Sequence, residues 1–282
     1  MFSSLHLMEL QWIKSLQTLS SPLLDALMMA FASLDSMPFY VLLITAVCFS
    51  YDQKIGFRFL ILAILSWFLN QDCKLFFQEP RPFHLDPSLG MAQTGSFGFP
   101  SGAAQSFVVY LGFLCLIFKK KWLWLASIAL TLLVSFSRVY LGLHFVSDII
   151  GGWILGGMLL TSYLYAQPKI EAFLSKRPKK LSVLFSLGAF AILFLLALNT
   201  KTRLIAWGFL GTTLGCIFAP SLPNPLSWKQ RILRPLLALV GLAFLVGLHR
   251  LVPITWPILE PINALACNLW FTCGASFFNK RL

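Results

Sequence analysis

Charged residues are scarce in this sequence. Asp, Glu, Lys and Arg make up 11% of its 282 residues, whereas hydrophobic residues make up 58%. Soluble domains carry about 25% charged residues, so the composition excludes an ordinary soluble fold. Polar segments are short and recur between apolar ones, which leaves no stretch suited to a soluble domain. We therefore expect an integral membrane protein whose apolar surface faces lipid.

The six cysteines also lack a pattern. They include no CxxC pair, and most of them lie in apolar runs. Such cysteines are typical of small buried positions and argue against a disulfide framework or a zinc site. We expect neither a metal nor a cofactor.

Apolar segments recur at lengths suited to a bilayer, which takes roughly 20 residues per helix. They predict an all-α polytopic bundle of about nine transmembrane helices within a single membrane domain, residues 1–282. Interfacial amphipathic segments are expected over 1–35, where Ser21-Pro22 opens a short helix. Additional transmembrane helices are expected over 181–277. The nine predicted spans are 36–51, 55–77, 102–118, 122–137, 145–166, 181–199, 204–219, 235–249 and 257–276.

The basic residues predict the orientation. Alternating the sides of the spans puts fifteen of the 22 Lys and Arg residues on one side and seven on the other. By the positive-inside rule the first side is cytoplasmic. The net charge of +12 is thus explained by orientation and by attraction to anionic lipid, and no nucleic acid is expected as a partner. The seven outer residues are Lys14, Lys74, Arg81, Arg138, Lys201, Arg203 and Arg250.

Three of these outer residues lie at helix ends that the alternation brings to one face. Lys74 and Arg81 lie at the outer end of the second span, and Arg138 lies at the outer end of the fourth. Guanidinium groups can bind phosphate oxygens bidentately, and a lysine adds a compact charge. Ser101-Gly102 opens the third span, where backbone N–H groups and the helix dipole favour an anion. Each signal alone is weak, because Lys74 and Arg81 can also be anchors at a helix end.

His144 and Asp148 open the fifth span on the same side, four residues apart and therefore on one helix face. A carboxylate there can fix one imidazole nitrogen as the donor and leave the other to attack phosphorus. An aspartate inside an apolar segment is a functional residue by default. The pattern predicts a phosphohistidine that water hydrolyses.

Three motifs therefore occur in order: Lys74 with Arg81-Pro82, Pro100-Ser101-Gly102, and Ser137-Arg138 with His144 and Asp148. They resemble the three-part signature of the type 2 phosphatidic acid phosphatase superfamily, which includes bacterial lipid phosphate phosphatases, undecaprenyl diphosphate phosphatases and glucose-6-phosphatase. The resemblance covers about residues 55–166, the expected catalytic core. It implies a metal-free mechanism with His144 as nucleophile and Asp148 as its orienting partner. It also implies phosphoryl binding by Lys74, Arg81, Ser101, Gly102 and Arg138.

One position departs from this family. Its members have PSGH, and this chain has PSGA, with Ala103 where a histidine protonates the leaving oxygen. General acid catalysis contributes about 10²–10⁴-fold, so we expect phosphate binding with slow turnover or none. The intact remainder of the site favours an engineered inactivation, and a natural pseudo-enzyme is the alternative.

The expected reaction is removal of a terminal phosphate from a lipid phosphate or diphosphate at the outer face. Undecaprenyl diphosphate, phosphatidylglycerol phosphate, phosphatidic acid and a sphingoid phosphate are all candidate substrates. A glucose-6-phosphatase-like sugar phosphatase and a lipid phosphotransferase are the other catalytic alternatives. The expected location is a bacterial inner membrane with the site on the periplasmic face, or on the lumenal face in a eukaryote.

Three further residues have no assigned role in this scheme. His84 and Asp86 follow Arg81 into the outer loop, where they either contact substrate or form a turn. Glu260 is an acid within the last predicted span, and the sequence leaves its role and the oligomeric state open.

Overall fold

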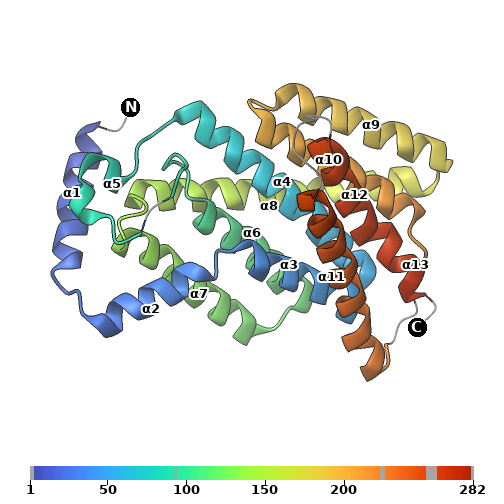
Figure 1. Ribbon diagram of the computed structural model, residues 1–282, viewed down its shortest axis with the longest axis horizontal. Helices are drawn as coiled ribbons and strands as arrows, with labels where there is room; N and C mark the ends of the chain where they lie inside the picture. The colour runs from blue at the N-terminus through green and yellow to red at the C-terminus, as the bar shows by residue number, and fades with distance from the viewer. Residues whose placement is uncertain (1–2, 93, 223–225, 252–258, 281–282) are drawn as a thin grey trace. The chain divides into compact units, whose positions relative to one another are not determined.

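The computed structural model describes residues 3–92, 94–222, 226–251 and 259–280 (Figure 1). These residues are mostly helical and contain no β-strand, so the predicted all-α fold is confirmed. The helices are α1 (Ser3–Gln17), α2 (Pro22–Ser33), α3 (Met37–Ala46), α4 (Gln53–Phe77), α5 (Pro82–Leu85), α6 (Gly102–Phe118), α7 (Lys121–Tyr140), α8 (Val146–Ser175), α9 (Lys179–Leu196), α10 (Thr200–Phe218), α11 (Trp228–Leu251), α12 (Leu259–Leu269) and α13 (Ala275–Asn279). Short π-helical turns, η1 (Val47–Tyr51) and η3 (Trp270–Gly274), follow α3 and α12, and a 3₁₀ turn, η2 (Pro87–Leu89), follows α5.

Helix occupies each of the nine predicted spans, although residues 257 and 258 of the last one lie outside the described part of the chain. Five of the described helices are long and apolar enough to cross a membrane, or six if the bent pair of α2 with α3 and η1 is one span. By length and composition alone, fewer of the described helices qualify than the nine predicted spans. The chain is an integral membrane protein with five to six candidate spans.

Three predicted spans are not long and apolar enough to cross a membrane on their own, because they are short or contain polar residues. Helix α6 has 17 residues, which is short for a bilayer core. Helix α10 begins with the polar run Thr200 to Arg203, and α12 has 11 residues, among them Glu260. Such helices cross lipid only with support from neighbouring helices.

The amino-terminal helices agree with the sequence prediction. The side chain of Ser21 caps α2 by accepting a hydrogen bond from the backbone N–H of Leu24, at 3.3 Å. Pro22 occupies the first helical position, where its fixed φ and missing N–H cost nothing.

The chain divides into two compact units. The first comprises Met1–Phe39 and Leu69–Tyr163, and the second comprises Tyr40–Phe68 and Leu164–Leu282. The single membrane domain over 1–282 stays a prediction.

In the first unit, one face of α1 packs against the segments that precede and open α6 and α8. Its Leu10 and Ile13 form a buried cluster with residues of three other helices and a turn. The other members are Leu89, Ala104, Val139, Phe145 and Ile149. This cluster fixes the ends of several helices close together, which is where the predicted site residues lie.

In the second unit, α10 and α12 approach closely at small residues. A Cβ on Gly211 would lie 2.4 Å from the carbonyl oxygen of Leu265, so only glycine fits there. The Thr212 hydroxyl donates to the side-chain oxygen of Asn268 at 3.1 Å. Glu260 lies in the first turn of α12, so it belongs to this unit and not to the one that contains the predicted site.

Candidate active site

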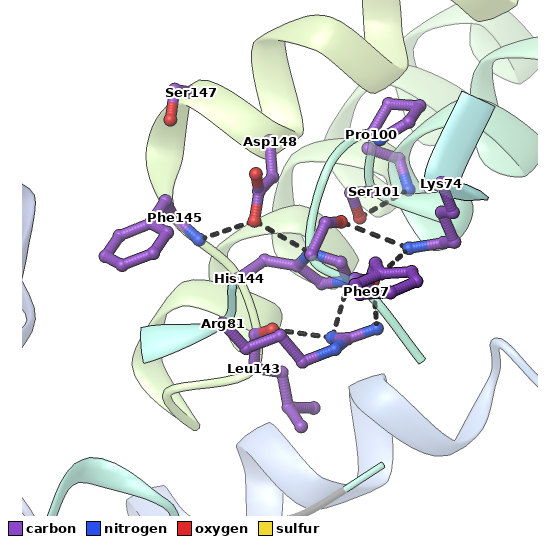
Figure 2. Close-up of polar contacts among 12 residues, drawn as sticks. Lys74, Arg81, Phe97, Pro100, Ser101, Leu143, His144, Phe145, Ser147 and Asp148 are labelled. Carbon is purple, nitrogen blue, oxygen red and sulfur yellow. Dashed lines mark hydrogen bonds and ion pairs between the residues drawn. The ribbon is translucent and has the colours of Figure 1, made fainter. Parts of the chain in front are cut away.

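Five of the predicted site residues come together in the first unit. Lys74 lies in the last turn of α4, Arg81 precedes α5, and Ser101 precedes α6. His144 and Asp148 lie just before and within the first turn of α8 (Figure 2). All five are almost fully buried, with exposed fractions of 5% or less.

His144 is bonded on both of its ring nitrogens. Its Nδ1 lies 3.1 Å from Oδ2 of Asp148, and its Nε2 lies 3.1 Å from Nη1 of Arg81 (Figure 2). A guanidinium group can only donate, so Nε2 must be the acceptor and the ring proton must be on Nδ1, donated to Asp148. The same carboxylate oxygen accepts from the backbone N–H of Phe145 at 3.0 Å. This arrangement selects the tautomer whose Nε2 lone pair is nucleophilic.

The surroundings of His144 disfavour its protonation. Burial lowers its pKa well below the usual 6.5, and the positive charges of Arg81, Lys74 and Arg138 lower it further. A neutral imidazole is the form that can attack an electrophile, so the electrostatics agree with the tautomer.

Lys74 and Arg81 both bind the loop before α6. Lys74 donates to the carbonyl oxygens of Phe97 at 2.7 Å and Gly98 at 3.1 Å. Arg81 donates from Nη2 to the hydroxyl of Ser96 at 2.9 Å and to the Phe97 carbonyl at 3.0 Å. A phosphate that enters would compete with these neutral carbonyl acceptors, and charge-assisted bonds to an anion are the stronger ones.

Gly98 is required where this loop meets Asp148. A Cβ at that position would lie 2.6 Å from the carbonyl oxygen of Pro80 and 3.1 Å from Oδ2 of Asp148. The sequence prediction missed the loop residues 96–98, for which the only local signal is the glycine itself.

Ser101 and Gly102 form the start of α6 as predicted. The backbone N–H of Ser101 donates to the carbonyl of Asp148 at 2.9 Å, which joins the starts of α6 and α8. The Ser101 hydroxyl accepts weakly from the N–H of Ala104, at 3.5 Å. Gly102 lies close to the side chain of Asn70, since a Cβ at this position would lie 3.1 Å from its Oδ1.

A buried amide pair that sequence reasoning missed supports this helix start. Asn70, on α4, donates to the side-chain oxygen of Gln105 at 2.8 Å and to the carbonyl of Pro100 at 3.3 Å. Both amides are 4% exposed or less. Their signal in the sequence is a pair of polar residues inside apolar spans.

Arg138 bonds residues at the end of α2. Its Nη2 donates to Oδ2 of Asp35 at 2.9 Å and to the carbonyl of Ala32 at 2.7 Å, both at the end of α2. Its charge nevertheless acts on His144, so it lies within electrostatic range of the site. Asp35 was not among the predicted site residues.

Ala103 contributes no polar group. It is 2% exposed and lies on the face of α6 that also carries Phe107 and Tyr110, four and seven residues further on.

The two loop residues have different neighbours. The exposed His84 accepts on Nδ1 from the backbone N–H of Arg81 at 3.2 Å, so it buttresses the backbone of a site residue. Asp86 pairs with Lys14 at 2.7 Å and accepts from the N–H and hydroxyl of Ser88. These hydrogen bonds, with that from Lys14 the strongest, lower the pKa of Asp86 to about 2. Asp86 therefore forms the turn that the sequence left as one of two alternatives.

The segments that carry this site also match known proteins. Residues 55–171 match the model of the PAP2 superfamily, which begins where the predicted core of 55–166 begins and ends five residues later. An undecaprenyl-diphosphatase of Sulfolobus acidocaldarius is 34% identical over 42% of this chain and 57% of its own length. A lipid A 4'-phosphatase of Bacteroides thetaiotaomicron is 30% identical over 49% of this chain and 67% of its own. The matched segment thus spans little more than half of the archaeal relative.

A solved structure is also similar. The transmembrane PAP2 type phosphatidylglycerolphosphate phosphatase of Bacillus subtilis superposes with a TM-score of 0.50 and 26% sequence identity. The superposition covers 59% of this chain and 88% of that protein. The matched sequence contains the buried histidine, aspartate and cations described above, and on these grounds the chain belongs to the PAP2 superfamily.

Proposed function

We propose that this chain is a metal-independent phosphatase that removes a terminal phosphate from a membrane-borne lipid phosphate or diphosphate. The observation that carries the proposal is the state of His144. Its proton is on Nδ1, donated to Asp148, and its Nε2 lone pair points at a cationic group that a phosphate can replace. A neutral, oriented imidazole facing buried cations is suited to attack phosphorus.

The reaction would proceed in two displacements. The incoming phosphate displaces the carbonyl ligands of Lys74 and Arg81, and its charge is offset by these two cations and by Arg138. Nε2 of His144 attacks phosphorus, the ester oxygen leaves, and water then hydrolyses the phosphohistidine. Cations at the equatorial oxygens stabilise the charge that develops in the transition state.

The names of the relatives support a lipid substrate. An undecaprenyl-diphosphatase, lipid A 4'-phosphatases and phosphatidylglycerophosphatase B are all named for lipid phosphates. The proposed substrate class is therefore an amphiphile whose phosphate enters the site while its tail stays in the bilayer. We further propose that the site faces the outer, periplasmic side, since the basic loops favour the opposite side as cytoplasmic.

Ala103 sets the rate in this proposal. Without a histidine at that position, the leaving oxygen loses a donor that contributes about 10²–10⁴-fold, so turnover of alkyl phosphates is slow unless another residue supplies the proton. A pseudo-enzyme that only binds lipid phosphates is the second candidate, and the methyl group at 103 is the observation that favours it.

Restoring the histidine tests the proposal. The Ala103→His variant, in nanodiscs, is expected to release phosphate from at least one of undecaprenyl diphosphate, phosphatidylglycerol phosphate, phosphatidic acid and a sphingoid phosphate. Phosphate release from glucose 6-phosphate, a soluble substrate, would distinguish a sugar phosphatase from a lipid phosphatase. Adding His144→Ala should abolish both release and acid-labile phosphoenzyme. No release from any substrate by Ala103→His would refute the hydrolase, and label transferred to lipid would indicate a phosphotransferase.

A further inference from the structure

The face of α6 that carries Ala103 is covered by the segment that carries Asp35. The ring of Phe39, four residues after Asp35, is parallel to that of Phe107 with centroids 6.4 Å apart. Phe107 lies one turn after Ala103 on the same helix face. The segment that carries Asp35 therefore packs on α6 one helix turn from Ala103.

Asp35 forms an ion pair with Arg138, one of the proposed phosphate-binding residues. Its Oδ2 accepts from Nη2 of Arg138 at 2.9 Å, and its side chain is 25% exposed. Its charge also acts on Lys74 and on Arg81, so the carboxylate lies within electrostatic range of both. It acts on Tyr110 as well, two turns along α6 from Ala103. A carboxyl group that pairs with Arg138 and lies within electrostatic range of Lys74 and Arg81 is suited to reach the leaving oxygen of a bound ester.

We propose that Asp35 is the general acid and base of this site, in the role that Ala103 cannot fill. The proposal rests on the phosphatase function proposed above and identifies one further catalytic residue for it. An acid at the break between α2 and α3, two apolar helices, is costly to maintain without a function.

The substrate supplies the proton that Asp35 transfers. In the empty site Asp35 is paired with Arg138. A phosphate that binds Arg138 brings negative charge beside Asp35, and two neighbouring anions disfavour each other. A monoester is partly monoanionic near neutral pH, since its second pKa is about 6, so it carries in the proton that Asp35 takes up.

The atoms balance over the two displacements. Nε2 of His144 forms a bond to phosphorus as the bond from phosphorus to the ester oxygen breaks, and Asp35 gives its proton to that oxygen. Water then attacks phosphorus, Asp35 accepts a proton from the water, and the phosphorus–nitrogen bond breaks. The products are the alcohol and phosphate. The phosphate takes the proton from Asp35 and leaves as its monoanion, so His144 and Asp35 return to their initial states.

Leaving groups of different basicity provide the test. An alkyl phosphate needs a proton on its leaving oxygen, whereas p-nitrophenolate leaves p-nitrophenyl phosphate without one. Asp35→Asn keeps an oxygen that can accept from Arg138 but cannot donate an acidic proton. In the otherwise unchanged chain it should lower phosphatidic acid turnover about 100-fold and p-nitrophenyl phosphate turnover less than about threefold. Equal losses on both substrates, or no loss, would overturn the proposal, because a mere counterion of Arg138 affects both alike.

Two controls separate the outcomes. Asp25→Asn changes an acid of α2 that bonds Tyr140 and Ser20 and lies outside the site, so both activities should be retained. In an Ala103→His background, Asp35→Asn should lower the turnover of phosphatidic acid less than it does in the unchanged chain, because the histidine supplies the proton. If Ala103→His is active and the unchanged chain hydrolyses neither substrate, Asp35 is not the acid although the phosphatase stands. If Ala103→His is also inactive on every substrate, the phosphatase and the role of Asp35 both fall.

Discussion

Glu9 of α1 binds Ser147, the residue directly before Asp148, through both of its carboxylate oxygens. One oxygen accepts from the Ser147 backbone N–H at 2.7 Å and the other from its hydroxyl at 2.9 Å. Glu9 is 2% exposed. A carboxylate at the amino end of α8 satisfies an N–H that the helix leaves unpaired and interacts favourably with the helix dipole. The amino-terminal helix thus contributes to the orientation of His144 and Asp148, the proposed catalytic pair.

Glu9→Gln should therefore lower kcat while KM stays within about twofold. The amide can accept only one of the two bonds, and a buried donor left unpaired costs about 1–3 kcal/mol. Steady-state kinetics in the Ala103→His background measures the effect. Ser147→Ala removes one bond from the other side, and the double variant should lose less than the sum of the two single losses. Additive losses would mean that the two residues act separately.

The lowered pKa of His144 predicts a pH dependence of stability. The folded chain resists protonation of this histidine, whereas the unfolded chain takes up a proton near pH 6.5. Stability is therefore fully present above about pH 6.5 and falls as the pH drops below it, by at most about 1.4 kcal/mol per pH unit for one group.

Thermal unfolding in detergent between pH 7.5 and 5 should show this fall. His144→Gln, which cannot take up a proton, should reduce the slope of stability against pH. The slope that remains would include a contribution from His6, whose pKa burial also lowers. A slope that His144→Gln leaves unchanged would show that His144 is not a buried neutral group.

The sequence predicted the site better where its residues form local patterns. The cations, the helix start and the pair His144 and Asp148 have a fixed order and lie at helix ends, so one orientation of the spans brings them together. Asp35 and Glu9 have no such pattern. Each reaches the site through a contact more than 100 residues away in the chain, with Arg138 or Ser147, and only tertiary packing determines such a contact.

Three predicted spans fall short of the length and composition of a membrane-crossing helix for a related reason. Apolar composition shows that a segment is buried in lipid or protein, but it does not distinguish the two. Helix α6 is apolar because much of it packs inside the first unit, with Phe107, Val109 and Phe113 nearly inaccessible. A periodic apolar pattern alone cannot separate such a helix from a lipid-facing one.

Arg81 should not tolerate replacement by lysine. Its guanidinium donates to Ser96, Phe97 and the Leu143 carbonyl in addition to His144, which a single ammonium group cannot match. Losing one or two charge-assisted hydrogen bonds costs about 1.5–3 kcal/mol each. Arg81→Lys should therefore raise the orthovanadate concentration for half-maximal inhibition of the Ala103→His enzyme at least about tenfold. Unchanged inhibition would place the phosphate away from Arg81.

The loop before α6 offers a matched pair of glycines for a last prediction. At Gly98 a Cβ would lie 2.6 Å from the Pro80 carbonyl, a backbone atom that cannot move aside cheaply, whereas at Gly95 nothing lies within 4 Å. Gly98→Ala should displace the carbonyls that Lys74 contacts and cost about 1–3 kcal/mol of stability. Turnover of the Ala103→His enzyme and its unfolding midpoint should both fall. Gly95→Ala should leave both unchanged, and equal effects of the two substitutions would mean that the close contact at Gly98 does not shape the site.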